Sequence, residues 1–255
     1  MPLTLAQLSD THLLAQPTDC LRGLNPWQSF QAVLAAALEY QLDGLLLTGD
    51  LAEEDSLEAY EHLRAATESL DLPIYWIPGN HDNPALLHQV FTDVPYHGPN
   101  QSLDLGHWRL ILLDSVLPTA QFGEGHLSPD TLTWLEDTLA QHPAQPTAVA
   151  LHHPPVSTGI DWLDQIQLQR ADDFLTRLER FEQVKVVTFG HAHLEIDQRW
   201  GEVCYYGCPS TVHQVTPTQP SPNHDQPGFR LITLHPNGQH QTEVRRVALT
   251  VAVGG

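Results

Sequence analysis

Short apolar segments alternate with segments of helical periodicity from the N-terminus to about residue 189. The apolar runs predict strands over residues 3–8, 44–50, 74–77, 108–114, 147–151 and 184–189. The run at 44–50, which reads GLLLTGD, is typical of a strand that is covered on both faces. This alternation of strands and helices predicts an α/β fold.

Apolar residues at helical spacing predict helices between these strands. Asp55 and Glu58 have the spacing of a capping box at the start of one of them. Two others start at a polar N-cap followed by proline, which is favoured in the first turn of a helix. The predicted helices begin at Asn25-Pro26, cover residues 56–69, begin at Ser128-Pro129 and cover residues 171–181.

The pattern changes to strand pairs from residue 198 onward. Turns are expected at Gly201 and at Asn237-Gly238, which is a strong hairpin signal. Residues 216–228 are rich in proline and polar side chains and predict an irregular surface loop. The chain shows no internal repeat or linker, and its length suits one core. We therefore expect a single domain over residues 1–255 with a β-rich C-terminal part.

Charge is the compositional outlier, because 31 acidic residues against 11 lysines and arginines give a net charge of −20. Such a surface repels polyanions and argues against nucleic acid or an anionic membrane as a partner. No apolar run approaches the ~18 residues that span a bilayer, and no basic leader precedes an apolar segment. With only three cysteines, we expect a cytoplasmic protein, either monomer or homodimer.

Side chains that bind metals follow five of the predicted strands. Open α/β sheets place their chemistry at the carboxyl ends of their strands. Unpartnered polar groups at buried strand ends would cost several kcal/mol, and a metal centre compensates for that cost. The residues are Asp10 and His12 in SDTH, Asp50 in TGD, Asn80, His81 and Asp82 in GNHD, His152 and His153 in HHPP, and His191 and His193 in GHAH.

These five blocks, in this order, resemble the signature of the calcineurin-like metallophosphoesterases: D-x-H, G-D, G-N-H-D, H and G-H-x-H. Further segments, among them LTGDLAEE, GHLSPDTLTWLE, LHHPPV and GFRLITLHPNG, are similar to the bacterial class III cyclic nucleotide phosphodiesterases, the cyclic-AMP phosphodiesterase group. The resemblance implies a four-layer α-β-β-α sandwich of two mixed sheets with helices outside.

The resemblance also implies two divalent metal ions, with Asp50 bridging them. A carboxylate has two oxygens and can hold two neighbouring cations. Oxygen and imidazole ligands without thiolate suit iron, manganese or zinc, and the family precedent favours iron or manganese. One ion would be bound by Asp10, His12, Asp50 and His193, and the other by Asp50, Asn80, His152 and His191.

Among the remaining residues, His81 is predicted to assist the leaving oxygen, either as general acid or by stabilising the developing charge. Asp82 is assigned to catalysis with it, either orienting its ring or holding the loop. His153 is expected to have a supporting role. The substrate phosphate would be surrounded by His12, Asp50, Asn80, His81 and His193, whereas surface or packing roles are expected for His88, His97, His107, His142, His213, His224, His235 and His240.

The activity implied by the resemblance is hydrolysis of a 3',5'-cyclic nucleotide to the 5'-monophosphate, with cyclic AMP as the leading candidate substrate. For the base and sugar, only the loops at 13–22 and 208–213 stand out, with Arg22 as a candidate anion partner. Two alternatives stay open: a phosphoesterase of broader specificity, and a scaffold that binds proteins without catalysis. The intact set of metal-type residues argues against the scaffold.

Overall fold

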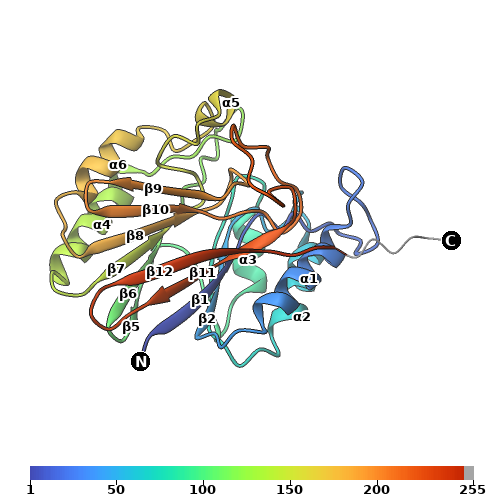
Figure 1. Cartoon of the computed structure of the whole chain (residues 1–255), viewed down its shortest axis with the longest axis horizontal. Coiled ribbons are helices and arrows are strands. Elements are labelled where there is room, and N and C mark those ends of the chain that lie inside the picture. Colours follow the sequence, from blue (N-terminus) through green and yellow to red (C-terminus); the bar gives the residue numbers. More distant parts are fainter. Residues whose placement is uncertain (250–255) are drawn as a thin grey trace.

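Two mixed β-sheets form the centre of the computed structural model, which describes residues 1–249 (Figure 1). The first sheet contains β1 (Leu3–Leu8), β2 (Gly44–Thr48), β3 (Ile74–Ile77), β4 (Tyr96–His97), β11 (Gly228–Leu234) and β12 (His240–Arg246). The second contains β5 (Gln101–Leu105), β6 (Trp108–Leu112), β7 (Thr147–Ala150), β8 (Val184–Phe189), β9 (Ile196–Trp200) and β10 (Val203–Gly207).

Parallel strands occupy the middle of both sheets. The first sheet has the order β12-β11-β1-β2-β3-β4, and the second has the order β5-β6-β7-β8-β10-β9. β1, β2, β3 and β4 are parallel, as are β6, β7, β8 and β10. The antiparallel strands β11, β12, β5 and β9 lie toward the sheet edges. The carboxyl ends of the central strands therefore share one edge in each sheet.

Helices cover the outer faces and complete four layers (Figure 1). α1 (Pro26–Ala37), α2 (Leu57–Thr67) and α3 (Pro84–Val90) pack on the first sheet, and α4 (Pro129–Gln141) and α6 (Ala171–Leu178) pack on the second. A third apolar cluster, with Leu46, Ile77, Leu110 and Val186, fills the space between the sheets. The predicted α-β-β-α sandwich is confirmed.

The predicted strands and helices that form these layers are present, and their ends differ from the predicted ones by a few residues. Three features of the sequence interpretation were wrong or incomplete. Ser56, not Asp55, caps α2 and accepts a hydrogen bond from the Ala59 amide at 3.2 Å. β9 begins at Ile196, before the predicted position. Short elements escaped prediction: α3, β4, β5 and the single turn α5 (Asp161–Asp164). Such segments are too short to establish a periodic pattern.

The C-terminal predictions are confirmed within the described residues. β11 and β12 form a hairpin whose turn contains Gly238, and the His235 amide donates to the Gln239 carbonyl at 2.8 Å. The segment that precedes β11 is irregular, as its proline content predicts. None of the helices within residues 1–249 is long and apolar enough to cross a membrane.

Candidate metal centre

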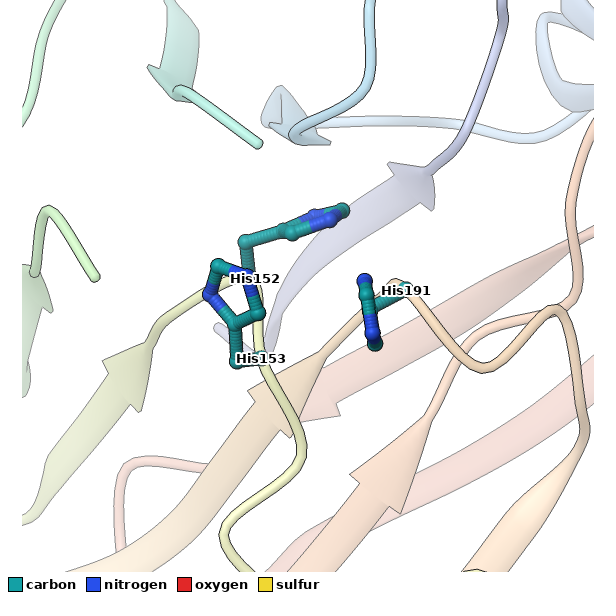
Figure 2. Close-up of side chains that lie close together, drawn as sticks. All are labelled: His152, His153 and His191. Atoms are coloured by element: carbon teal, nitrogen blue, oxygen red, sulfur yellow. The ribbon is translucent and has the colours of Figure 1, made fainter. Parts of the chain in front are cut away.

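The polar residues predicted at the strand ends meet at one edge of the two sheets. Asp10 and His12 follow β1, Asp50 follows β2, Asn80 follows β3, His152 follows β7, and His191 and His193 follow β8. Figure 2 shows His152 and His153 leaving the end of β7 beside His191, which leaves the end of β8. Parallel strands bring these segments together although, for example, 181 positions separate Asp10 from His191 in the chain.

Backbone strain is concentrated at this edge. Among residues 1–249, nine non-glycine residues have positive φ, and five of them belong to the predicted ligand set. A left-handed conformation costs such a residue about 1–3 kcal/mol and persists only where the surroundings hold it. Strain clustered in this way is typical of functional sites. The five residues are Asp10, His12, Asp50, His191 and His193.

The ring nitrogens of His12 and His193 face each other without a donor between them. His12 Nδ1 donates to Glu53 Oε2 at 2.6 Å, and His193 Nδ1 donates to the His213 carbonyl at 2.7 Å. Each bond fixes the ring and leaves Nε2 with a lone pair. The two Nε2 atoms lie 3.1 Å apart, and that of His193 is 3.3 Å from Asp10 Oδ1. Only a proton or a cation between these acceptors makes the contact favourable.

A second set of acceptors converges on the other side of Asp50. His152 Nδ1 donates to the Thr48 carbonyl at 2.7 Å, so its Nε2 faces Asn80 Oδ1 at 3.3 Å and Asp50 Oδ2 at 3.4 Å. Asn80 Oδ1 also lies 2.8 Å from His191 Nδ1. The buried Nε2 of His191 has no hydrogen-bond partner among residues 1–249. This donor set fits a first-row divalent cation.

Asp50 lies between the two groups of acceptors. Its Oδ2 is 3.4 Å from His152 Nε2 and 3.9 Å from His12 Nε2, and Oδ1 accepts from the His81 amide at 2.9 Å. Two of the clusters that could hold an ion are Asp10–His12–His193 and Asp10–Asp50–His152, in each of which the donor atoms lie within 4.8 Å of one another. The contacts support Asp50 as the bridge, which stays a prediction.

Buried charges shape the protonation of the centre. Burial alone would raise the pKa of Asp50, but the neighbouring His152 and His12 hold this pKa well below its usual value. Burial alone would lower the pKa of His152, but the Asp50 and Asp10 carboxylates raise it to about 9. The ion-free centre therefore keeps ionised carboxylates and a proton on His152. A cation bound here would take the place of that proton, so metal binding would release protons.

His153 lies beside the centre but its nitrogens are already engaged. Its Nδ1 is 2.8 Å from Ser115 Oγ, and its Nε2 donates to the Gly123 carbonyl at 3.0 Å. Burial and the neighbouring His191 lower the pKa of His153 well below its usual value, so the ring is neutral. Although His153 completes a third cluster with His152 and His191, its contacts are those of the predicted supporting role.

His81 stands at the opening of the centre. Its side chain is 38% exposed, and Nδ1 lies 3.1 Å from the Glu53 carbonyl and 3.7 Å from Glu53 Oε2. With Nδ1 donating to that carbonyl, Nε2 is the nitrogen that remains for a substrate. The loop that carries His81 packs closely against Asp50. The α-carbon of Gly79 lies so near that an added Cβ would overlap the Asp50 carboxylate, so only glycine fits at this position.

Asp82 binds backbone and not the His81 ring. Its carboxylate accepts from the amides of Leu51, Ala52 and Gly79 at 2.8–3.1 Å and from Tyr60 Oη at 3.0 Å. These bonds join the loop after β2 to the loop after β3. Of the two roles predicted for Asp82, they provide the second, so we assign it to positioning and not to catalysis.

Replacing Asp82 by alanine is expected to lower the free energy of unfolding by about 3–5 kcal/mol. The change leaves three buried amides and a hydroxyl without their charged acceptor. Urea denaturation of the ion-free protein measures the loss. Tyr60→Phe, which removes one of these bonds to Asp82, should cost only about 1–2 kcal/mol. An Asp82→Ala protein within 1 kcal/mol of the wild type would contradict this role.

Two contacts of the centre have no signal in the sequence. Glu53 fixes the His12 ring, but an acidic residue three positions after Asp50 also suits an ordinary surface loop. His213 contributes its backbone carbonyl to His193, and its Nε2 contacts the Leu21 carbonyl at 2.7 Å. A backbone contact of this kind does not depend on residue type, so His213, expected in packing, could not be recognised.

The centre forms the floor of an open cavity of about 200 Å³. Arg22, the candidate anion partner, lines it, and it is the only lysine or arginine among the lining residues that the structure describes. The cavity wall also contains His213, Gln214 and Val215. The predicted loops 13–22 and 208–213 thus both reach the cavity, each through its last residues.

Comparisons with known proteins agree with this geometry. The family model for calcineurin-like phosphoesterases matches residues 3–195. A 3',5'-cyclic-nucleotide phosphodiesterase from Nostoc is 37% identical over 99% of this chain and 96% of its own length. The 3',5'-cyclic adenosine monophosphate phosphodiesterase CpdA from Escherichia coli is 38% identical over 96% of this chain and 90% of its own.

Solved structures support the same fold. A dimetal phosphatase from Danio rerio superposes with a TM-score of 0.66 at 12% identity, over 96% of this chain and 99% of its own. At that identity the likeness concerns the fold alone. The matching family model and the extended similarity to the two bacterial enzymes show the family directly. The chain belongs to the calcineurin-like phosphoesterase family.

Proposed function

We propose that this protein is a metal-dependent phosphodiesterase that hydrolyses 3',5'-cyclic nucleotides to nucleoside 5'-monophosphates. Cyclic AMP is the leading candidate substrate. One observation carries the proposal: histidine lone pairs and two buried carboxylates converge at the floor of an open cavity. The substrate class is supported by the names of the two bacterial relatives, each of which matches nearly the whole chain.

We infer that the centre binds two divalent ions, iron or manganese, with zinc as a further candidate. Asp10, His12, Asp50 and His193 would hold one ion, and Asp50, Asn80, His152 and His191 the other. Ions at these positions would draw charge from the phosphoryl oxygens and lower the pKa of water. The rings of His12, His152 and His193 are held in place by the hydrogen bonds of their Nδ1 atoms.

We propose that His81 assists departure of the 3' oxygen. An alkoxide is a poor leaving group, so a proton delivered to it lowers the barrier. The His81 ring can carry that proton on Nε2 while Nδ1 stays bonded to the Glu53 carbonyl at 3.1 Å. The Glu53 carboxylate, 3.7 Å from Nδ1, balances the charge of the protonated ring. His12, Asp50, Asn80 and His193 would surround the phosphate with His81.

A substrate panel tests the proposal. Protein reconstituted with iron, manganese or zinc in turn is assayed with cyclic AMP, cyclic GMP, 2',3'-cyclic AMP and bis(4-nitrophenyl) phosphate. We expect the largest kcat/KM for a 3',5'-cyclic nucleotide. Equal or faster turnover of the 2',3'-cyclic or aryl diester would favour the broader phosphoesterase. No turnover of any substrate with any metal would favour the scaffold.

The sequence also supports proposals on the compartment, the oligomeric state and the partners of the protein. We propose a cytoplasmic protein that is a monomer or a homodimer and whose partner is a small cyclic nucleotide. The net charge of −20 disfavours nucleic acid and anionic membranes as partners.

A further inference from the structure

Polar and apolar side chains both line the cavity above the metal centre. The polar lining residues include His12, Asp50, Asn80, His81, His191 and His193. The apolar lining residues are Leu21, Phe122, Trp162, Leu163, Ile166 and Val215. A phosphodiester group suits the polar lining residues only. The apolar lining residues fit a ligand whose remaining part is apolar and flat.

Two aromatic side chains among the apolar lining residues are open to solvent. Phe122 is 78% exposed and Trp162 is 54% exposed, whereas most large aromatic residues of residues 1–249 are buried. Both line the cavity that contains the centre. Scattered exposed apolar residues need no explanation, but two aromatic rings at the mouth of one functional cavity indicate a binding surface.

The segment that carries Phe122 is held in place by hydrogen bonds. The amides of Gln121 and Phe122 donate to the Glu124 carboxylate at 3.1 and 2.9 Å. His153, which follows β7, donates to the Gly123 carbonyl at 3.0 Å. Because the backbone on both sides of the ring is fixed, little further ordering is needed when a ligand contacts it.

The segment that carries Trp162 is fixed in a similar way and is joined to the first. Asp164 accepts from the Thr158 amide and from Thr158 Oγ1, both at 2.7 Å. The Gly125 amide donates to the Gln167 carbonyl at 3.2 Å, and the Gln169 amide donates to the Gly125 carbonyl at 2.7 Å. The two aromatic side chains therefore belong to two segments that backbone hydrogen bonds join at the cavity.

We propose that Trp162, together with Phe122, forms a stacking platform for the nucleobase of the substrate. The proposal rests on the proposed function, because it assigns the base once the phosphate lies at the metal centre. The cavity of about 200 Å³ is smaller than the ~300–1,000 Å³ of most ligand sites, so a nucleotide must extend to the mouth where these rings lie. Stacking on an aromatic side chain contributes about 1–3 kcal/mol and accepts any base.

The first test compares substrates with and without a base. For the metal-loaded enzyme, kcat/KM is measured with cyclic AMP and with methyl riboside 3',5'-cyclic phosphate, which keeps the ribose and phosphate. Trp162→Ala should lower the ratio of the two values about tenfold, and Trp162→Phe should restore most of it. Trp200→Ala, which removes a tryptophan that is 47% exposed on β9, should leave the ratio unchanged. A ratio unaltered by Trp162→Ala would overturn the proposal.

The second test measures stacking of the base by fluorescence, without hydrolysis. 2-Aminopurine riboside 5'-monophosphate loses fluorescence when its base stacks, and it is titrated into the metal-loaded wild type, Trp162→Ala and Phe122→Ala proteins. We expect quenching with the wild type and a marked loss of it in both variants. Absent quenching in the wild type, or equal quenching in all three, would overturn the platform. Because this readout needs no hydrolysis, it separates failure of the platform from failure of the proposed activity.

Discussion

Asp50→Asn is expected to lower kcat/KM by at least about 10³-fold and to abolish binding of the two proposed metal ions. The change is nearly isosteric, and the amide oxygen can still accept from the His81 amide at the position of Oδ1. The negative charge is lost at Oδ2, which lies 3.4 Å from His152 Nε2 and 3.9 Å from His12 Nε2. Loss of one electrostatic group at such a centre typically costs 10²–10³-fold, and loss of the ions costs more.

Metal analysis after dialysis and kinetics with cyclic AMP check this prediction. Asp71→Asn is the matched control, because Asp71 is an exposed aspartate between α2 and β3. It should keep the metal content and the turnover of the wild type. An Asp50→Asn protein that still binds two ions per chain would show that this carboxylate does not lie between them.

Most of the strands, and the polar residues that follow them, were predictable because their signals are local. A buried strand needs a continuous apolar run such as residues 44–48, and a site at its carboxyl end requires polar residues directly after that run. Asp10, Asp50 and Asn80 all follow buried strands in this way. Their convergence depends only on the parallel order of the strands, which the alternation of strands and helices already indicates.

The remaining parts of the site depend on tertiary position, which no local pattern records. Glu53, Phe122 and Trp162 lie on irregular segments or on a single helical turn, where periodicity carries no information. Asp82 is a related case, because its place in GNHD suggested catalysis. Its four partners are three amides from the loops after β2 and β3 and a hydroxyl from α2, and they meet only in the folded chain.

Strain and support are distributed between different residues of the centre. The predicted ligands Asp10, His12 and Asp50 occupy left-handed backbone conformations, which disfavour them by about 1–3 kcal/mol each. Buried groups that are not ligands, above all Asp82, bind the loops that carry them. This division explains why Asp82→Ala is expected to act on stability whereas Asp50→Asn acts on metal content.

His81→Ala should separate catalysis from metal binding. We expect the variant to retain both ions and to lose about 10²–10⁴-fold in kcat with cyclic AMP, the range for a general acid. His81 lies outside the predicted ligand set. Its ring forms a further possible donor group with His12 and Glu53, but its Nδ1 lies 3.1 Å from the Glu53 carbonyl. The loss should be much smaller with bis(4-nitrophenyl) phosphate, because 4-nitrophenolate leaves without a proton.

Comparison of the two substrates across pH makes this assignment testable. A group that only packs against the centre would change the turnover of both substrates alike, whereas a proton donor affects the substrate with the poor leaving group. His107→Ala, at an exposed turn between β5 and β6, serves as the matched control and should behave as the wild type. Near-normal turnover of cyclic AMP by His81→Ala at every pH would exclude His81 as the acid, and the donor would then have to be another group at the cavity.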